Sequence, residues 1–513
     1  MTSASPYYVA TAIPYVNARP HIGFALEVAI ADAIARHRRR RGRDVLLVTG
    51  TDEHSLKNVL AAERAGTDTA DWVARHAESF RALWPALGAV PDEFVRTSTD
   101  PRHRIAVEAL WRRLAAAGDL HRGAYRGLYC VGCERFVEPD ELAAGLCPEH
   151  GAPPEEIAED NWFFRLGRHA PAVRDAIVSG RLVVEPASAR EETLAFLSRE
   201  VRDLSVSRSA ARARGWGIAV PGDPDQVVYV WVDALAYYLA ALDWGRPGAD
   251  PARFARYWAG DGERVHVVGK GITRFHTVIW PALLLAAGLP LPTHVLVHGH
   301  VTVDGVKIAK SGISVDPVPL AARHGADVVR HTLLRHIRTT RDGDFREERL
   351  EQAHDAELAN QLGNLVQRAA SLAHRLCGGR VPHRAGDDPE RAELRGELLA
   401  LPGRVDAAID RFCLDDAIGA VFAAGLATNR YLERTAPWSR ARAGDHAGAA
   451  AAVRAALDAV AALAGELGPF LPATSEAILG CLAADGAAPV WRQLRGGAPI
   501  AQPLPLFPRR RAG

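Results

Sequence analysis

The sequence lacks an excess of charge of either sign. Its 62 Lys and Arg residues nearly balance its 61 Asp and Glu residues, so the net charge is only +1. This balance excludes a global positive field that would hold a nucleic acid over the whole surface. Any contact with RNA must therefore come from local groups.

Long apolar runs and leader-like features are also scarce. The start, MTSASPYYVATAIPYV, has no basic stretch followed by an apolar stretch and a small-residue cleavage site. No run approaches the roughly 18 uninterrupted apolar residues that a membrane-spanning helix needs. We therefore expect a soluble, cytoplasmic protein without a membrane anchor.

The six cysteines are few for a chain of 513 residues, and three of them are clustered. The pattern Cys-x2-Cys, thirteen intervening residues and Cys-x2-His places four sulfur and nitrogen ligands at zinc-knuckle spacing. Four protein ligands leave no open position, so the predicted zinc is structural. The predicted ligands are Cys130, Cys133, Cys147 and His150. Cys377, Cys413 and Cys481 are isolated, and we expect them to be packed as ordinary thiols.

The alternation of strand and helix patterns predicts an α/β fold. Residues 7–13 are rich in strand formers, residues 21–37 place apolar side chains at helical spacing, and residues 45–48 form a second apolar run. This order favours a parallel βαβ unit, which binds ligands at the carboxyl ends of its strands. The pattern of parallel strands resumes with VVYVWVDAL, RVHVVGKGI and THVLVHG, interrupted by an apolar helix near residues 280–287.

The chain has 513 residues, of which 48% are hydrophobic. It is therefore longer than the roughly 250 to 300 residues at which a single core usually divides into domains. Long amphipathic helical patterns from about residue 350 predict a helical bundle. We expect, in order, the first half of a nucleotide-binding domain at 1–117, an insertion with the zinc knuckle at 118–225, the second half at 226–300, a stem-contact region with a lysine loop at 301–349 and an α-helical domain at 350–513.

An arginine-rich run occupies residues 36–43 at the end of the first predicted helix. Such a run can bind RNA, but arginines in the last turn of a helix also offset its dipole and solvate its surface. We favour the second interpretation.

Two short motifs are suited to phosphate binding. PHIGF opens the first predicted helix, where Gly23 lets a ligand approach the backbone and the helix N-terminus offers N–H donors. KIAKS follows the last predicted strand and supplies two lysines and a serine that can neutralise a triphosphate. Each motif alone is a weak signal, but their joint occurrence in this order is informative.

These motifs resemble the HIGH and KMSKS signatures of class I aminoacyl-tRNA synthetases, present here as HIGF and KIAKS. The chain is identified as a member of the methionyl-tRNA synthetase family in particular. The segments that carry this resemblance, in the family's order and spacing, are AIPYVNARPHIGF, TGTDEH, RDLSVSR, YVWVDAL, RFHTVIWPA, VHGHVTVDGVKIAKS, LGNLVQR and TAPW. The resemblance implies a Rossmann-type doubly wound sheet, split by the zinc-knuckle insertion and followed by an anticodon-binding helical domain.

The resemblance also implies a two-step reaction. ATP and L-methionine give methionyl-adenylate, and the aminoacyl group then passes to the 3′ end of a methionine tRNA, initiator or elongator. No protein nucleophile is needed, so catalysis comes from positioning and from stabilising phosphate charge, with Mg²⁺ on the phosphates. The catalytic residues that it implies are His21, Gly23, Lys307, Lys310 and Ser311. The ATP-binding set is His21, Gly23, Glu27 and Lys310.

The family's methionine pocket also maps onto this sequence. Asp52 can pair with the substrate ammonium, Trp231 can enclose the thioether, and His276 or Tyr15 can donate a weak hydrogen bond to its sulfur. Without the resemblance, Trp231 and Tyr238 would be ordinary core aromatics and Asp52 a helix cap. The implied pocket is Ile13, Tyr15, Asp52, Trp231, Ala234, Leu235, Tyr238, Ile272 and His276.

In the helical part, Asn364 and Arg368 are four residues apart, one helical turn, and Trp438 ends the TAPW segment. They match the family's anticodon-reading positions, and stacking on an aromatic together with hydrogen bonds to base edges is how loop bases are read. The alternative is that Trp438 only ends and packs a helix.

The sequence departs from the family pattern mainly around ATP. Phe24 replaces the second histidine of HIGH, Gly271 stands where an acid is usual near the ribose, Ala309 replaces a serine, and the lysine loop is one residue short. Two further functions therefore remain open, an activating paralogue that acylates a small molecule and a non-catalytic tRNA-binding protein. The leading prediction is a monomeric methionine--tRNA ligase, whether a housekeeping enzyme or a second, inhibitor-tolerant copy.

Overall fold

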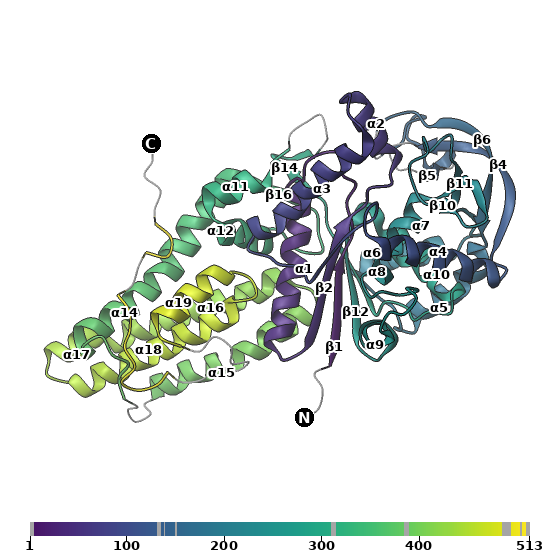
Figure 1. Cartoon of the computed structure of the whole chain (residues 1–513). Helices are drawn as coiled ribbons and strands as arrows, with labels where there is room; N and C mark the ends of the chain where they lie inside the picture. Colours follow the sequence, from purple (N-terminus) through teal and green to yellow (C-terminus); the bar gives the residue numbers. More distant parts are fainter. Residues whose placement is uncertain are drawn as a thin grey trace. The chain divides into compact units, whose positions relative to one another are not determined.

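Two units, neither continuous in sequence, make up the chain (Figure 1). The computed structural model describes residues 5–130, 135–137, 139–148, 151–308, 314–383, 389–484, 494–502 and 505–508. Unit 1 consists of Met1–Pro20, Asp44–Trp84 and Pro91–His298, and unit 2 of His21–Arg43, Pro85–Val90 and Gly299–Gly513.

Unit 1 is built on a six-stranded parallel sheet. In spatial order its strands are β3 (Glu93–Arg96), β2 (Asp44–Thr51), β1 (Pro6–Thr11), β12 (Glu263–Gly269), β13 (His294–His298) and β7 (Val183–Glu185). The central strands β1 and β2 are buried along nearly their whole length, because helices cover both faces of such sheets. The α/β prediction and the strands expected near residues 7–13, 45–48, 264–272 and 293–299 are confirmed.

Helices surround this sheet, and their apolar faces form one core with it. The core is rich in aromatic residues, among which Tyr8 and Trp258 meet edge to face with ring centroids 5.5 Å apart. The helices of unit 1 are α2 (Leu56–Arg64), α3 (Thr69–Ala86), α4 (Pro101–Ala116), α5 (Leu166–Val178), α6 (Ala187–Leu197), α7 (Val230–Leu235), α8 (Tyr237–Ala240), α9 (Pro251–Phe254), η2 (Ala255–Ala259), η3 (Lys270–Ile272), η4 (Phe275–Ile279) and α10 (Trp280–Ala286).

One strand prediction is wrong. VVYVWVDAL does not form a parallel strand, because β11 (Asp223–Val228) pairs antiparallel with β9 (Ser207–Ser209) and β10 (Ala219–Val220), and helix α7 begins at Val230. A short apolar run buried on all sides has the same composition as a strand or a helix, so periodicity alone could not separate them. The helix places the Asp233 carboxylate between two histidine side chains, as described below.

The predicted insertion is only partly separate from the main sheet. It contains two antiparallel sheets, built from β4 (Leu120–Cys130), β5 (Arg135–Val137), β6 (Glu155–Phe164) and β8 (Leu204–Ser205), and from β9 (Ser207–Ser209), β10 (Ala219–Val220) and β11. A short helix, η1 (Pro139–Glu141), follows β5. However, α5 and α6 pack into the core of the main sheet, and β7 pairs with β13. The middle of the 118–225 range therefore completes the nucleotide-binding fold.

Unit 2 combines a small sheet with a helical bundle, as predicted from residue 350 onward. The sheet order is β15 (Val306–Lys307), β14 (Val301–Val303) and β16 (Gly343–Phe345). The helices are α1 (Ile22–Arg40), α11 (Pro317–His324), α12 (Ala326–His331), η5 (Thr332–His336), α13 (Glu347–Ala353), η6 (His354–Gly363), α14 (Asn364–Cys377), α15 (Pro389–Asp410), α16 (Leu414–Thr435), α17 (Pro437–Arg442), α18 (His446–Leu467) and α19 (Pro472–Cys481).

Alanine side chains on α18 allow close packing of the bundle helices. Leu394 and Leu398 of α15 and Tyr431 of α16 pack against a row of alanines on α18, whose small side chains let the helices approach. By length and composition α18 is the one described helix that could cross a membrane, yet 83% of its most apolar window is buried within the structure. It is therefore a core helix of the bundle.

The arginine run at the end of α1 makes ion pairs within unit 2. Arg38 pairs with Asp410 at 2.8 Å, and Arg41 pairs with Asp406 at 2.7 Å and with Glu466 at 2.8 Å. These carboxylates lie on α15 and α18, so the run fixes α1 to the bundle. The structural interpretation of this run is the one that the contacts support.

A fully buried arginine strengthens the same junction. The Arg330 guanidinium lies 2.7 Å from Asp32 Oδ2 on α1, and it donates to the carbonyls of Phe470, Pro469 and Leu87 at 2.7, 2.9 and 3.4 Å. A buried charge is tolerated when it is paired and its donors are satisfied, as they are here. Arg330 therefore joins α1, α12 and the loop before α19.

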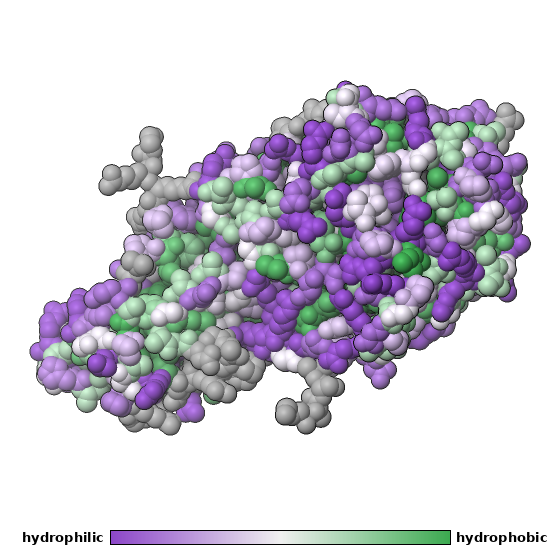
Figure 2. Space-filling model, in the orientation of Figure 1, coloured by the Kyte–Doolittle hydropathy of each residue, from purple (hydrophilic) through white to green (hydrophobic). Residues whose placement is uncertain are grey.

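Hydrophilic residues are spread over the surface of both units, with apolar residues interspersed, on the face shown in Figure 2.

Candidate active site

The carboxyl ends of β1 and β2 carry two of the predicted pocket residues. Tyr15 and Asp52 form an isolated parallel bridge, and the Asp52 N–H donates to the carbonyl of Pro14 at 2.9 Å. Asn58 donates to the Asp52 carbonyl at 3.0 Å, and Asp52 is almost fully buried. Backbone contacts thus hold the Asp52 carboxylate at the sheet edge where ligands bind in such folds.

Aromatic side chains on α7 and η4 pack together beside Tyr15. Tyr15 meets Trp231 edge to face at 6.1 Å, and Trp231 stacks on Phe275 at 3.7 Å with the ring planes 9° apart. The Trp231 Nε1 is a buried donor without a hydrogen-bond partner among the described residues. Sequence reasoning missed Phe275, although it lies in the quoted segment RFHTVIWPA. Ile13 and Ile272 are half-buried and pack against the same core.

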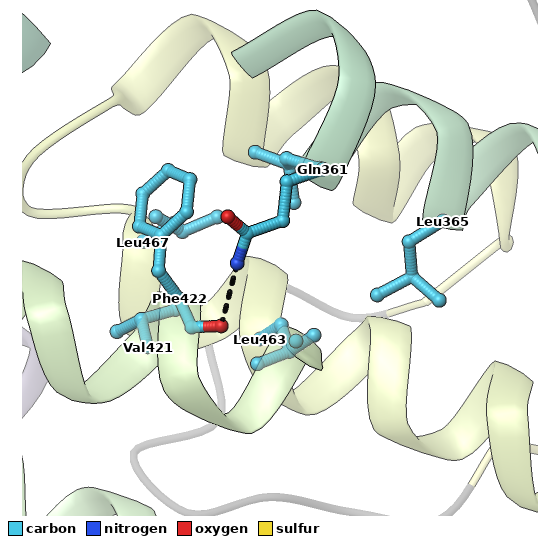
Figure 3. Close-up of a pocket in the computed structure, with 8 residues that line it drawn as sticks. Gln361, Leu365, Val421, Phe422, Leu463 and Leu467 are labelled. Atoms are coloured by element: carbon cyan, nitrogen blue, oxygen red, sulfur yellow. Dashed lines mark hydrogen bonds between the residues drawn. The ribbon is translucent and has the colours of Figure 1, made fainter. Parts of the chain in front are cut away.

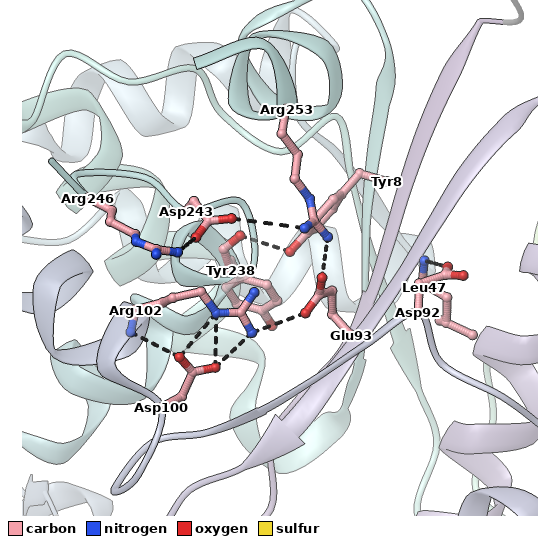
Figure 4. Close-up of polar contacts among 10 residues, drawn as sticks. All are labelled: Tyr8, Leu47, Asp92, Glu93, Asp100, Arg102, Tyr238, Asp243, Arg246 and Arg253. Carbon is pink, nitrogen blue, oxygen red and sulfur yellow. Dashed lines mark hydrogen bonds and ion pairs between the residues drawn. The ribbon is translucent and has the colours of Figure 1, made fainter. Parts of the chain in front are cut away.

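Tyr238, on α8, is the centre of a second group of rings. It stacks on His266 of β12 at 3.8 Å and meets His276 edge to face at 6.0 Å. Figure 4 shows how this helix is held to β1, since the Tyr8 hydroxyl donates to the Tyr238 carbonyl at 2.9 Å. Burial raises the pKa of Tyr8 well above its ordinary value, so the hydroxyl remains a donor.

Ion pairs hold strand β3 to the neighbouring helices α4 and α9. Glu93 lies between Arg102, at 3.1 Å, and Arg253, and Arg102 also pairs with Asp100 at 2.7 Å (Figure 4). Asp100 caps α4 by accepting from the Arg102 N–H at 2.9 Å. The network connects β3, α4 and α9.

The protonation of His276 is determined by its surroundings. Its Nδ1 lies 3.0 Å from the Ile272 carbonyl, which can only accept, so Nδ1 carries the proton and Nε2 presents a lone pair. Burial lowers the pKa of His276 to about 4. A neutral imidazole in this tautomer presents only an acceptor at Nε2.

Three residues that the sequence reasoning did not single out form a closed triad, His54, His103 and Asp233. The His54 Nδ1–H donates to Asp233 Oδ2 at 2.7 Å, and the His103 Nε2–H donates to Oδ1. Burial alone would raise the pKa of Asp233, but the two imidazoles outweigh it and hold that pKa well below its usual range.

The closed triad lies at the junction of the pocket segments. His54 follows Asp52 by two residues, and α7 carries Asp233 together with Trp231, Ala234 and Leu235. The triad therefore fixes the Asp52 loop against α7. An aspartate inside an otherwise apolar run, VWVDAL, was the sequence signal for it, because a buried carboxylate needs partners.

The first phosphate motif forms the start of α1 in unit 2. The Gly23 N–H donates to His21 Nδ1 at 3.1 Å, so His21 caps the helix and its proton lies on Nε2. A Cβ at Gly23 would meet the His21 ring at 3.0 Å, which explains the glycine. The Phe24 ring lies 4.3 Å from His21, and Glu27 is buried on the next turn.

The second phosphate motif follows a tight hairpin. β14 and β15 are joined by Asp304 and Gly305, with φ of 51° and 76°, values that an Asp-Gly hairpin turn requires. Asp344 braces the turn by accepting from the Gly305 N–H and from Thr302, each at 2.7 Å. The Arg346 guanidinium, with these donors, lowers the pKa of Asp344 to about 2.

The residues directly after the lysine loop contact the start of α1. The Ile22 N–H donates to the Val315 carbonyl at 3.0 Å. The described chain after the lysine loop is thus tied at Val315 to the start of α1 within unit 2. The structure describes the backbone of Lys307 but not its side chain, and Lys310, Ser311 and Ala309 lie outside the described residues.

Two of the four predicted zinc ligands are within the described residues. Cys130 and Cys147 are both 2% exposed and belong to one small cluster with Val137. Cys133 and His150 lie outside the described residues. Two buried thiols side by side fit half of a Cys3His site.

The predicted anticodon residues lie on α14 and α17. The Arg368 guanidinium lies 4.8 Å over the ring of Trp438, and its Nη1 is 3.7 Å from Glu433. Asn364 is exposed one turn before Arg368. The structure thus joins Arg368 and Trp438 in one surface feature with a cation over an aromatic ring.

The chain matches two families of known proteins. The profile described as tRNA synthetases class I (M) matches residues 7–156 and 132–370, and that described as the anticodon binding domain of methionyl tRNA ligase matches residues 381–507. The chain belongs to the methionyl-tRNA synthetase family.

Two relatives in this family match along nearly their whole length. The methionine--tRNA ligase of Brucella suis is 36% identical over 99% of this chain and 98% of its own, and that of Mycobacterium bovis is 38% identical over 98% of both. The crystal structure of Mycobacterium tuberculosis methionyl-tRNA synthetase bound by methionyl-adenylate superposes with a TM-score of 0.93 at 36% identity, covering 98% of this chain and 100% of that one. The predicted fold and family are confirmed.

Proposed function

We propose that this methionyl-tRNA synthetase family member charges tRNA with methionine. A carboxylate oxygen of L-methionine attacks the α-phosphorus of ATP, and the bond to pyrophosphate breaks to leave methionyl-adenylate. A hydroxyl at the 3′ end of a methionine tRNA, initiator or elongator, then attacks the carbonyl carbon, and AMP leaves. The observation that carries this proposal is the gathering of Tyr15, Asp52, Trp231 and His276 at one edge of the sheet.

Methionine is recognised by opposite ends of this pocket. Asp52 pairs with the substrate ammonium, while apolar and aromatic side chains enclose the thioether. The Tyr15 hydroxyl donates to the sulfur. The residues that enclose the side chain are Ile13, Trp231, Ala234, Leu235, Tyr238, Ile272 and His276.

ATP is held by the groups of the two phosphate motifs. His21 offers its Nε2–H and Gly23 its approachable backbone, and Glu27 completes the nucleotide contacts. Lys307, Lys310 and Ser311 neutralise and orient the phosphates as charge moves to pyrophosphate. Bound Mg²⁺ supplies further neutralisation of phosphate charge.

Two further sites complete the proposal. Asn364, Arg368 and Trp438 read the anticodon, because a ring with a guanidinium over it and an adjacent amide can stack on and hydrogen-bond to splayed bases. One structural zinc is held by Cys130, Cys133, Cys147 and His150. We infer a cytoplasmic monomer without membrane association, with the domain order predicted from the sequence.

The experiment is amino-acid-dependent exchange of pyrophosphate into ATP, followed by transfer to tRNA. We expect exchange with methionine above all other amino acids and charging of methionine tRNA. Preference for another amino acid would overturn the assignment. Exchange without charging would support the small-molecule paralogue, and absence of exchange would support a tRNA-binding protein without catalysis.

Replacement of Trp438 by Ala tests the anticodon assignment separately. Charging should fall by about 10-fold or more, since base stacking contributes about 1–3 kcal/mol, while pyrophosphate exchange should not change. An equal loss of both activities would show that Trp438 only packs the helix end.

A further inference from the structure

Unit 2 contains an open trio of His331, His336 and Glu357 that the function proposed above does not use. The three residues come from the end of α12, the end of η5 and the middle of η6. The atoms that could bind a metal all lie within 4.8 Å of one another. His331 is fully buried, and the other two side chains are about one quarter exposed.

The side chains of the open trio converge at distances longer than the hydrogen bonds of the closed triad. His331 Nε2 lies 3.3 Å from Glu357 Oε2, and His336 Nε2 lies 3.2 Å from Oε1. Both ring nitrogens of His331, Nε2 of His336 and Oε2 of Glu357 have no hydrogen-bond partner among the described residues. The donors therefore do not point at the oxygens that they approach.

These distances are the ones that a shared metal ion produces. Ligands bound at about 2.0–2.1 Å to a tetrahedral zinc ion are about 3.3–3.4 Å from each other. Ligand atoms that bind one ion point at the ion and not at each other. The closed triad of unit 1 shows the opposite arrangement, with the His54 nitrogen 2.7 Å from the carboxylate and aligned for a hydrogen bond.

The backbone around the open trio is unusual in the same place. η5 and η6 are π-helical, so each shifts the register by one residue relative to an α-helix. Such segments are rare and are frequent at functional sites. Figure 3 shows how η6 is anchored, since Gln361 donates to the Phe422 carbonyl of α16 at 3.0 Å. The Phe422 ring in turn lies 5.3 Å from His331.

A network of ion pairs is the competing explanation. Arg335 Nε lies 3.6 Å from Glu357 Oε2, so one carboxylate would face a guanidinium and two imidazolium groups. Three cations around one carboxylate, with His331 fully buried, leave charge uncompensated, which is costly. Neutral imidazoles that bind a cation through their lone pairs avoid one of these costs, because the buried ring nitrogen then has a partner.

We propose that His331, His336 and Glu357 bind a divalent transition-metal ion of the zinc class. Two imidazole nitrogens and a carboxylate are a common protein ligand set for this ion, and three protein ligands leave a fourth position for water. The ion joins the turn after α12 to η6 within unit 2. It is distinct from the zinc proposed for the cysteine cluster, which lies in unit 1.

The test is the metal content of the full chain after loading with Zn²⁺ and gel filtration. We expect Glu357→Gln and His336→Gln each to hold one zinc fewer per chain than the wild type. His446→Gln, which removes a histidine from the exposed start of α18, should hold as much as the wild type. Far-UV circular dichroism checks that each variant is folded.

Loading with Co²⁺ distinguishes the two zinc sites. Thiolate-to-cobalt charge transfer reports the cysteine cluster and should be the same in all variants, whereas a visible band from the site without thiolates should vanish in Glu357→Gln and His336→Gln. Equal zinc content in folded wild-type and variant proteins, with unchanged cobalt spectra, would overturn the proposal. The charge-transfer band tests the cysteine assignment separately: its presence would support that assignment, and its absence would contradict it.

Discussion

The closed triad of unit 1 and the open trio of unit 2 have almost the same composition, two histidines and one carboxylate, but different geometry. In the closed triad each carboxylate oxygen of Asp233 accepts a hydrogen bond from one imidazole. In the open trio the same kinds of atoms lie slightly farther apart and are not aligned with one another. Composition alone therefore does not distinguish a structural clamp from an ion-binding site, whereas distance and direction do.

The largest expected effect comes from removing the carboxylate of the closed triad. Asp233→Asn should lower the free energy of unfolding of unit 1 by about 3 kcal/mol, because a buried acceptor of two hydrogen bonds is lost. Displacement of α7 should also lower kcat/KM for methionine by about 100-fold. Urea unfolding and pyrophosphate exchange measure the two effects.

The matched control is Glu357→Gln in metal-stripped protein. We expect this variant to lose less than about 1 kcal/mol of unfolding free energy, because the carboxylate is partly exposed and makes no aligned hydrogen bond to either imidazole. Equal losses in the two variants would mean that the difference in geometry has no energetic consequence.

The second prediction concerns added metal. At free Zn²⁺ about 100-fold above the dissociation constant of the open trio, unit 2 should gain about 2.7 kcal/mol of stability. Asp233→Asn should keep this gain and Glu357→Gln should lose it. Thermal unfolding in zinc buffers that keep the cysteine cluster occupied measures the gain. A zinc gain that disappears in Asp233→Asn would assign the ion to the closed triad instead.

The third prediction uses the pH dependence of stability to distinguish the contribution of His276 from that of the closed triad. His276 has a pKa of about 4 in the folded protein because it is buried, against an ordinary value of 6.5. Below about pH 6.5 the unfolded chain binds a proton that the folded chain does not, so stability falls as the pH falls toward 4. Between pH 6.5 and 5 the loss from this residue should be about 1.5 kcal/mol.

Replacement of His276 by Gln should flatten the pH dependence of stability by this amount, measured by urea unfolding at each pH. The Asp233 carboxylate takes up its proton at far lower pH, since its pKa is held well below the usual range, so it does not contribute a proton of its own in this window. An unchanged slope in the His276 variant would contradict the burial effect.

The smallest effect is expected at the edge of the closed triad. His54→Gln keeps a side-chain donor near Asp233 and should lower the free energy of unfolding by about 1 kcal/mol. Because His54 follows the Asp52 loop, KM for methionine should rise about 3-fold with little change in kcat. Steady-state exchange kinetics measure both constants. His336→Gln serves as the matched histidine variant and should leave KM unchanged.

Much of the fold and of the candidate site could be predicted from the sequence. Strands such as β1, β2, β12 and β13 are continuous apolar runs followed by turn residues, and this pattern is local. The phosphate motifs, the cysteine spacing and the pair Asn364 and Arg368 are likewise readable from neighbours in the chain.

The features that escaped prediction depend on distant residues. α7 was taken for a strand because its burial on all sides hides its period. The closed triad joins residues 130 and 179 positions apart, so neither His54 nor His103 carries a signal by itself. β7 joins the main sheet from within the insertion by pairing with β13, which no local pattern could indicate. The tautomer of His276 depends on the Ile272 carbonyl, which the residue type alone does not indicate.

The attachment of α1 to the bundle has a consequence for how the protein is made. α1 carries His21 and Gly23, yet its ion-pair partners are synthesised much later; His37 and Asp406, 2.8 Å apart, are separated by 369 positions in the chain. At about 5–20 residues per second, roughly 20 to 70 seconds pass on the ribosome between the two. During that time the C-terminal end of α1 exists without the partners that hold it, so a nascent chain should gain a firmly placed α1, and with it the ability to bind ATP, only after α15 and α18 have emerged.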